Sequence, residues 1–341
     1  MSEISPLVEE QEKFISAVPA QSMAAKTVAL DRALGRTLYS DLNAPEDSPP
    51  YHRAIVEGFL VNTAETRDAS EETPVSFKVV GSVAPGDAVC PGFGAGEAIE
   101  LQTGSILPDG QVSIVRMWEA KRDGDNVSIS RPFPPRFFIE DQGCDINKGD
   151  TIISAGTILT PQHIGTIASL GLSEVTVANQ PRVTVFASGD EVIPYTAPFK
   201  PGMIRDCNSP MLEAAVSAAG GLPTLGGIMS DNFETFVNAV RNTLNEADMI
   251  VISGGTAVGG RDFISDLISE VGELLVDGVP MRSGRPLIMG IANGKPIVAV
   301  AGHPPEALRG FQLFGAPAIA KLMGQTIELP QDQVQQPPNK M

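Results

Sequence analysis

Cysteine is scarce in this sequence, and Cys90, Cys144 and Cys207 lie far apart with no CxxC spacing. This excludes a disulfide framework and a cysteine zinc site, and it favours free thiols in a reducing compartment. The three histidines are also too scattered along the chain to predict a metal site. Cysteine and histidine therefore give no sign of a metal centre.

Positive charge and long apolar runs are scarce as well. The 24 lysines and arginines are outnumbered by 41 aspartates and glutamates, which gives a net charge of −17. Nucleic-acid binding needs a basic face and is not expected, although a local basic pocket for a small anion stays open. No apolar run approaches the roughly 18 residues that span a bilayer, and residues 1–19 lack the pattern of a signal peptide. We expect no membrane contact and a cytoplasmic location.

The 341 residues, 42% of them hydrophobic, suffice for two or three domains with buried cores. Changes in glycine, proline and apolar content divide the chain into four parts. They are a mixed α+β linker domain (1–43 plus 140–180), a small β-rich domain (44–139), an α/β domain (181–326) and a Gln- and Pro-rich tail expected to be disordered (327–341).

After residue 181, short apolar strands alternate with amphipathic helices. Near-continuous apolar runs at 183–187, 249–252 and 297–300 predict strands that are buried on both faces. The alternation predicts a three-layer α/β domain, in which ligands sit outside the carboxyl ends of the strands.

Capping residues and helical spacing predict the helices. Helices are expected over about 5–18, as a short helix within 29–41, after the cap Thr160, from Ser209, from the capping box Asp231-x-x-Glu234, and over 263–271.

Each of the three buried strands runs into an unusual loop. These loops are Ser188-Gly189-Asp190-Glu191, the glycine-rich residues 253–260, and Ala301-Gly302-His303-Pro304-Pro305. If the strands are neighbours in one sheet, the loops converge on one rim. His303 is a candidate ligand contact there because it lies in a Gly/Pro loop at a strand end.

The glycine-rich loop at 253–260 suits an anion, because glycines let backbone N–H groups approach a phosphate. It has neither the Walker pattern nor GxGxxG. On glycine content alone, a tight turn in a closely packed domain is an equally good interpretation. Downstream, Arg282 and Arg285 could fork around an oxyanion, whereas a surface ion pair is the commoner role of any single arginine.

Several acids fall at the ends of elements, where oxygen ligands beside a phosphate would suit Mg²⁺. They are Asp190, Glu191, Asp206, Asp231 and Asp262. Helix capping is the stronger interpretation of Asp231, and it is an equal alternative for Asp262.

Four segments in this order and spacing resemble the molybdopterin molybdenumtransferases of the MoeA type, which are related to the E domain of gephyrin. They are Ser188–Glu191, Gly202–Ser209, Ser253–Gly259 and Gly278–Pro286. Weaker similarities are Val56–Phe59, Gln102–Gly104 and Gly143–Ile146. The similarity extends over about residues 5–325.

The resemblance implies a MogA-like fold for the α/β domain and insertion of molybdate into adenylylated molybdopterin, with Mg²⁺ and release of AMP. It also implies a homodimer whose cleft joins the α/β domain of one subunit to the β-rich domain of the other. A molybdoenzyme or another protein of cofactor biosynthesis is a further possible partner.

Residue roles follow from matching motifs. The implied catalytic acids are Glu57, Asp145, Glu191, Asp231 and Asp262, with Glu191 and Asp262 as metal ligands. The implied contacts to the molybdopterin are Thr103, Ser188, Asp190, Asn208, Ser253, Gly254, Gly255, Thr256, Gly259, Arg282, Arg285 and His303.

The sequence departs from the family pattern at several of these positions. Glu57 stands where aspartate is usual, Thr256-Ala257 replaces Val-Ser, and His303 replaces asparagine. We also expect the family's fourth, C-terminal β domain to be missing. These changes favour a non-catalytic carrier or insertion chaperone for the cofactor. A protein that kept only the fold, for interactions, is a third alternative. The carboxylates kept at most positions favour an active molybdenumtransferase.

Overall fold

The structure is a computed structural model that describes residues 6–254, 263–281 and 284–327. The chain forms two compact units, which are considered separately below. The α/β unit contains residues 1–41, 154–165 and 173–341, and the β-rich unit contains residues 42–153 and 166–172. The two segments assigned to a linker domain, 1–43 and 140–180, are thus divided between the units.

The α/β unit is built on a six-stranded mixed sheet with the strand order β16-β13-β17-β20-β19-β18. Strands β16, β13, β17 and β20 are parallel, whereas β19 and β18 run antiparallel to their neighbours. The strands are β13 (Arg182–Ser188), β16 (Leu222–Met229), β17 (Met249–Ser253), β18 (Glu273–Met281), β19 (Gly284–Ala292) and β20 (Lys295–Val300).

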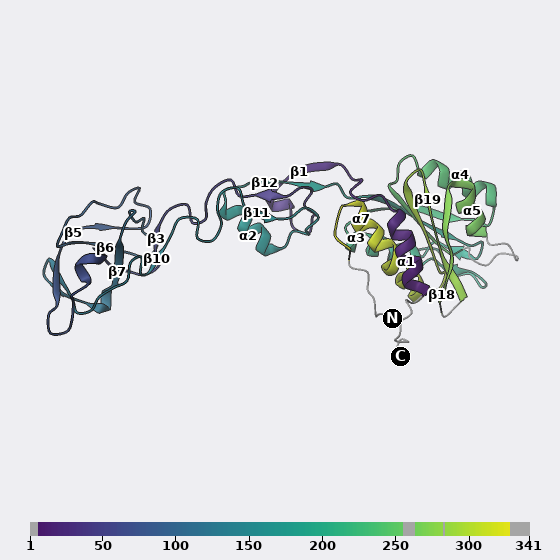
Figure 1. The fold of residues 1–341 in the computed structure, drawn as a ribbon. Coiled ribbons are helices and arrows are strands. Elements are labelled where there is room, and N and C mark those ends of the chain that lie inside the picture. Colours follow the sequence, from purple (N-terminus) through teal and green to yellow (C-terminus); the bar gives the residue numbers. More distant parts are fainter. Residues whose placement is uncertain (1–5, 255–262, 282–283, 328–341) are drawn as a thin grey trace. The chain divides into compact units, whose positions relative to one another are not determined.

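Helices cover both faces of this sheet, which confirms the predicted three-layer fold (Figure 1). Strand β17 shows why its sequence is apolar throughout: Met249 and Val251 face one core, while Ile250 and Ile252 face the other. One face packs against α1 (Pro6–Ala17), α3 (Asn208–Ala218), α6 (Pro304–Gly310), the π-helical turn Phe311–Gly315 and α7 (Ala316–Leu322). The other packs against α4 (Phe233–Thr243) and α5 (Phe263–Val271).

Helix α1 belongs to this core, although its sequence position suggested the linker domain. Phe14 is fully buried and packs against Phe314 with ring centroids 6.2 Å apart. The buried Gln11 side chain donates a hydrogen bond of 2.5 Å to the Leu313 carbonyl. Side-chain periodicity identified the helix, but only the tertiary structure reveals which core it covers.

The remaining part of the α/β unit includes β1 (Ala25–Ala29) paired antiparallel with β12 (Glu174–Ala178). The short helix expected within 29–41 is wrong, because only a 3₁₀ turn forms there, at Leu30–Arg32. Helix α2 (Pro161–Ser169) begins directly after Thr160, as predicted. The Thr160 hydroxyl accepts a hydrogen bond of 3.4 Å from the His163 N–H, so His163 has a structural place in the first turn.

The β-rich unit contains a second six-stranded sheet, with the order β7-β4-β6-β5-β9-β8. Its strands are β4 (Gly58–Asn62), β5 (Val75–Val83), β6 (Glu97–Leu101), β7 (Val112–Arg116), β8 (Ala120–Asp123) and β9 (Asn126–Ile129). Two short ladders join β3 (Arg53–Ala54) to β10 (Ile139–Glu140) and β2 (Leu42–Asn43) to β11 (Thr151–Ile153). Two 3₁₀ turns are Thr63–Thr66 and Met117–Glu119.

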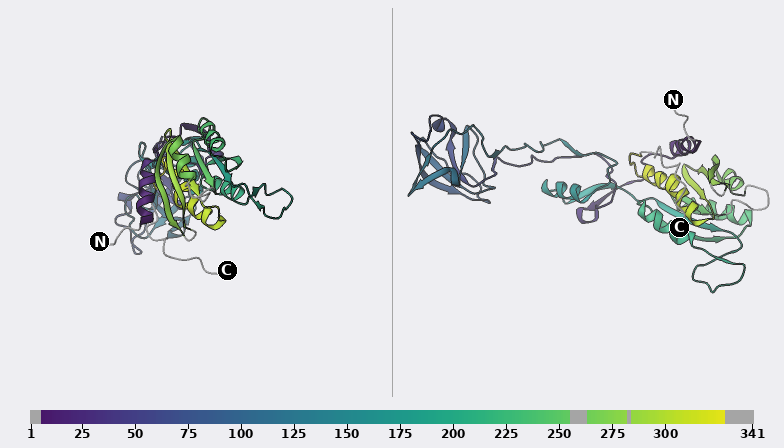
Figure 2. Two further views of the ribbon diagram at one scale, coloured as in Figure 1. Left: turned by 90° about the vertical axis from the view of Figure 1, so that its right-hand side faces the viewer. Right: turned by 90° about the horizontal axis from the view of Figure 1, so that it is seen from below.

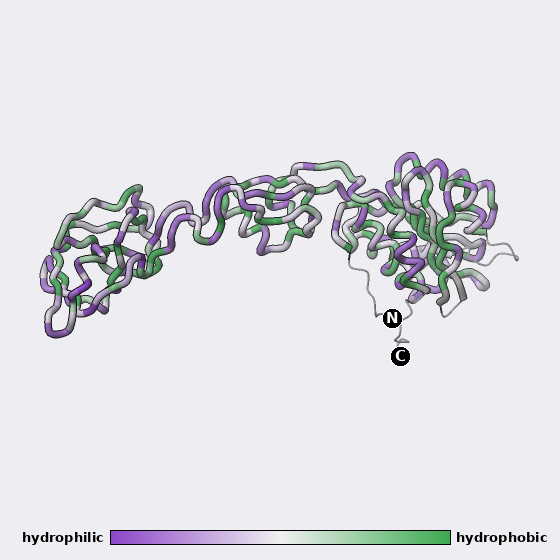
Figure 3. Tube along the Cα trace, in the orientation of Figure 1, coloured by the Kyte–Doolittle hydropathy of each residue, from purple (hydrophilic) through white to green (hydrophobic). Residues whose placement is uncertain are grey.

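The tube coloured by hydropathy shows hydrophobic segments, in green, in both units (Figure 3). Gly58 marks a close approach in the β-rich sheet, because a Cβ atom there would lie 2.0 Å from the Val115 carbonyl oxygen. The tail expected over 327–341 lies outside the described residues, except for Ile327, which packs against the α/β core. No helix among the described residues has the length and apolar character to span a bilayer.

Candidate functional site

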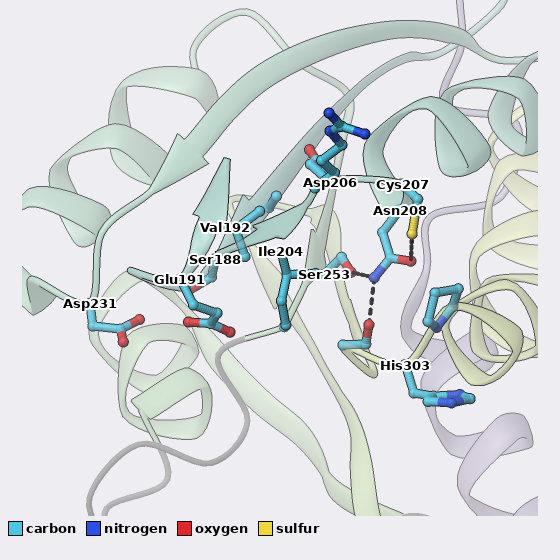
Figure 4. A pocket seen from close by; sticks show the side chains of 16 residues that line it. Ser188, Glu191, Val192, Ile204, Asp206, Cys207, Asn208, Asp231, Ser253 and His303 are labelled. Atoms are coloured by element: carbon cyan, nitrogen blue, oxygen red, sulfur yellow. Dashed lines mark hydrogen bonds between the residues drawn. The ribbon is translucent and has the colours of Figure 1, made fainter. Parts of the chain in front are cut away.

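A cleft of about 650 Å³ opens at the carboxyl ends of β13, β17 and β20. The three strand-end loops converge there, as expected for neighbouring parallel strands. The predicted residues that line the cleft are Ser188, Glu191, Asp206, Asn208, Asp231, Ser253, Gly254 and His303 (Figure 4). The predicted contact Asp190 lies beside it, where its carboxylate accepts a hydrogen bond of 3.2 Å from the Asp231 N–H.

Asn208 ties the loops after β17 and β20 together. Its side-chain amide donates hydrogen bonds to the Ser253 hydroxyl, at 2.7 Å, and to the Gly302 carbonyl, at 2.8 Å. The Ser253 hydroxyl in turn donates to the Ala301 carbonyl at 3.3 Å. Both Asn208 and Ser253 are buried, so this network fixes the floor of the cleft.

The first part of the glycine-rich loop is a tight turn. Gly254 has a φ of +89°, and a Cβ atom there would lie 2.6 Å from the Ser188 carbonyl oxygen. Its N–H donates to the Val300 carbonyl at 3.2 Å, so this N–H is not free to bind an anion. At Gly254 the close-packing interpretation is therefore the better one, while the rest of the loop lies outside the described residues.

A ladder of two short strands forms another side of the cleft, next to the floor held by Asn208. Strand β14 (Val192–Ile193) pairs in parallel with β15 (Ile204–Arg205). The Ile204 N–H donates to the Glu191 carbonyl, and the Asp206 N–H donates to the Ile193 carbonyl, both at 2.8 Å. The Asp206 carboxylate accepts a hydrogen bond of 2.9 Å from the Ser209 N–H in the first turn of α3. Asp206 therefore has a structural role at the cleft.

The capping role expected for Asp231 is wrong. Asn232 is the N-cap of α4, and its side-chain oxygen accepts from the Thr235 N–H at 2.9 Å. Asp231 is half-buried at the cleft, and its Oδ1 atom has no hydrogen-bond partner among the described residues. Burial raises the pKa of Asp231, and the charges of Asp190 and Glu191 raise it further.

This acidic end of the cleft fits a minimal Mg²⁺ site. Among residues 6–254, 263–281 and 284–327, no three acids, histidines or cysteines form a complete metal-binding group. Proteins, however, often hold Mg²⁺ with one or two carboxylates together with phosphate oxygens. The unpartnered oxygen of Asp231, with Glu191 beside it, provides such a donor set. A bound cation would also relieve the repulsion among the three carboxylates.

Several predicted residues cannot be located at the cleft. Gly255, Thr256, Gly259, Asp262 and Arg282 lie outside the described residues. The backbone of Arg285 belongs to β19, but its side chain is not described. The arginine fork, the metal ligand Asp262 and the phosphate-binding part of the glycine loop therefore stay predictions.

The remaining predicted residues lie in the β-rich unit. The Thr103 hydroxyl donates a hydrogen bond of 3.2 Å to the carboxylate of Glu57, and both residues are exposed. Asp145 is also exposed, and its N–H donates to the Ser48 carbonyl at 3.1 Å. The pKa of Arg53 is raised mainly by its hydrogen bond with Glu140 and in smaller part by the charge of Asp145.

Two family models match the chain. A model of the MoeA N-terminal region (domain I and II) matches residues 6–171, and one of a probable molybdopterin binding domain matches residues 184–321. A solved structure of the molybdopterin biosynthesis MoeA protein from Pyrococcus horikoshii is 30% identical, with a TM-score of 0.82, and the alignment covers 95% of this chain and 81% of that chain. The chain belongs to the molybdopterin molybdenumtransferase (MoeA) family.

A molybdopterin molybdenumtransferase from Staphylococcus aureus is 29% identical over 91% of this chain and 74% of its own length. A molybdopterin molybdenumtransferase from Staphylococcus epidermidis is 28% identical, and the alignment covers 89% of this chain and 73% of that protein. The second family model spans all the strand ends that form the cleft. The cleft thus lies in the part of this MoeA-family chain that matches the molybdopterin binding domain.

The sequence alone did not identify several residues that line the cleft. They include Val192, Ile204 and Cys207. A two-residue ladder has no periodicity to detect, so β14 and β15 left no strand signal. Ile204 and Cys207 lie within Gly202–Ser209, a segment that carries the family resemblance, but the candidate residues predicted from it are Asp206 and Asn208.

Proposed function

We propose that this chain acts in molybdenum cofactor biosynthesis as a molybdopterin molybdenumtransferase. It would bind adenylylated molybdopterin, insert molybdate and release AMP. The observation that carries this proposal is the cleft at the ends of β13, β17 and β20, where a rigid amide network faces a cluster of carboxylates that includes an unpartnered oxygen of Asp231. The names of the aligned relatives support the same activity.

The two ends of the cleft suggest different tasks. Asp231 and Glu191 would hold Mg²⁺, which would neutralise charge on the phosphate oxygens as the bond to AMP breaks. The exposed His303 ring would contact an anionic group at the other end, next to the Asn208 network. That network keeps the loops in place without reorganisation, which is how a preorganised site stabilises developing charge.

We further propose a homodimer in which the β-rich unit of the partner completes the cleft. Glu57 and Thr103 form one polar pair in that unit, and Asp145 is a second exposed acid. The glutamate at position 57 places its carboxylate one methylene further out than the usual aspartate, and its hydrogen bond from Thr103 restrains that longer side chain. This supports a functional, repositioned carboxylate.

The test is an anaerobic assay of AMP release from adenylylated molybdopterin with Mg²⁺ and molybdate. We expect molybdate-dependent AMP release by the wild-type chain and a loss on the order of a hundredfold or more in kcat for Asp231→Asn. The matched control is Glu234→Gln, which changes an exposed acid in the first turn of α4. Absence of AMP above the uncatalysed rate would refute the proposal, and retention of the pterin without AMP release would identify a carrier.

A further inference from the structure

The middle of the cleft is apolar. Val192 and Ile204 are cross-strand partners in the β14–β15 ladder, and both line the cleft. Figure 4 shows Ile204 between the acids Glu191 and Asp231 on one side and Asn208 on the other. Ile204 is 61% exposed. Two neighbouring apolar side chains inside a cleft with polar groups at its ends form a surface that a bound ligand can cover.

The polar groups at both ends restrict what can cover this surface. Both Nδ2 donors of Asn208 are occupied by Ser253 and Gly302, so that end offers few free donors. The opposite end offers carboxylate oxygens. A ligand in the middle therefore needs an apolar face and polar groups at its edges, which describes a flat heteroaromatic ring.

The apolar surface is also rigid. Two backbone hydrogen bonds of 2.8 Å hold β14 against β15, and β-branched side chains have few rotamers. A rigid surface loses little conformational entropy when a ring lies on it. We infer that Val192 and Ile204 form a platform for a fused heteroaromatic ring of the substrate. This inference rests on the proposed function, in which the adenylylated substrate carries two candidates, the adenine and the flat pyrimidine ring of the pterin.

The loop between the two strands supplies a matched control. Residues 194–203 project from the α/β unit as an open loop (Figure 2). Phe199 in this loop is 69% exposed but does not line the cleft. A change at Phe199 therefore alters exposed apolar surface on the same loop without touching the platform.

The experiment compares the wild-type chain with Ile204→Ser, Ile204→Leu and Phe199→Ser. Binding is measured by calorimetry for three probes: AMP, 6-hydroxymethylpterin phosphate and ribose 5-phosphate. We expect Ile204→Ser to weaken binding of one ring-bearing probe by about tenfold, the loss expected from removing roughly half of an aliphatic contact. Ile204→Leu should restore most of the affinity, and ribose 5-phosphate binding should not change.

The probe that responds identifies the ring, adenine or pterin. If Ile204→Ser weakened ribose 5-phosphate binding as much as binding of the ring-bearing probe, the variant would have a general structural defect, and the inference would be overturned. Three other results would also overturn the inference. The first is unchanged affinity of Ile204→Ser for both ring-bearing probes, and the second is a loss of affinity in Phe199→Ser as large as in Ile204→Ser. The third is failure of the wild-type chain to bind either ring-bearing probe.

AMP release measured in parallel separates the two claims. If the chain releases AMP but ring binding does not depend on Ile204, only the platform is refuted. If ring binding depends on Ile204 but no AMP is released, only the proposed function is refuted.

Discussion

Replacing Asn208 tests the rigid floor of the cleft. Asn208→Ala removes the hydrogen bonds of 2.7 Å to Ser253 and 2.8 Å to Gly302. Each hydrogen bond contributes about 0.5–1.5 kcal/mol net, so the α/β unit should lose about 1–3 kcal/mol of unfolding free energy. Asn208→Asp should cost more, because a carboxylate cannot donate to the Gly302 carbonyl and would repel it.

The two units allow the effect to be localised. Trp118 is the single tryptophan and lies in the β-rich unit, so tryptophan fluorescence should show unchanged unfolding of that unit. Hydrogen exchange should become faster in β17 and β20, and AMP release should fall. The control Asn245→Ala changes an exposed asparagine of the same unit. If Asn208→Asp has the same unfolding free energy and the same rate of AMP release as Asn245→Ala, the network does not hold the loops and the reasoning is refuted.

Two further predictions concern the acids. Burial and neighbouring charges raise the folded-state pKa of Asp231. The ionised carboxylate therefore lowers the free energy of unfolding at pH values above this raised pKa. The loss disappears as the pH falls through the raised pKa towards the ordinary carboxyl range, because the group becomes protonated. Asp231→Asn should therefore raise Tm at neutral pH, with a gain that shrinks towards acidic pH; a lower Tm at neutral pH would contradict the assignment. For the proposed shared cleft, mixing inactive Glu57→Gln and Asp231→Asn homodimers under subunit exchange should restore about a quarter of wild-type activity, because half of the dimers then hold one intact site. No recovery of AMP release despite demonstrated exchange would place both residues in the same subunit's site.

Local pattern predicted most of the α/β unit. The apolar runs in β13, β17 and β20 are continuous because both faces of these strands are buried, and this is visible in sequence. Capping was less certain: Asp231 and Asn232 are both good N-caps, and spacing alone could not decide between adjacent residues.

Long-range placement was beyond the sequence. Asn208 contacts Ser253 and Gly302, which lie 45 and 94 residues away along the chain. The order of the strands brings these residues together, and no local spacing encodes that order. The same holds for α1, whose apolar face could be recognised but not the core that it covers. The strand-end loops could be identified as candidates, whereas the apolar surface between them required the β14–β15 ladder.

The most direct test of the cleft uses its own thiol. Cys207 is exposed and lines the cleft, whereas Cys90 does not. The rate of alkylation of each cysteine can be followed by mass spectrometry, anaerobically, with and without saturating adenylylated molybdopterin. If the substrate binds in the cleft, alkylation of Cys207 should slow severalfold while that of Cys90 is unchanged. An unchanged rate at Cys207 under conditions of demonstrated binding would show that the substrate lies elsewhere.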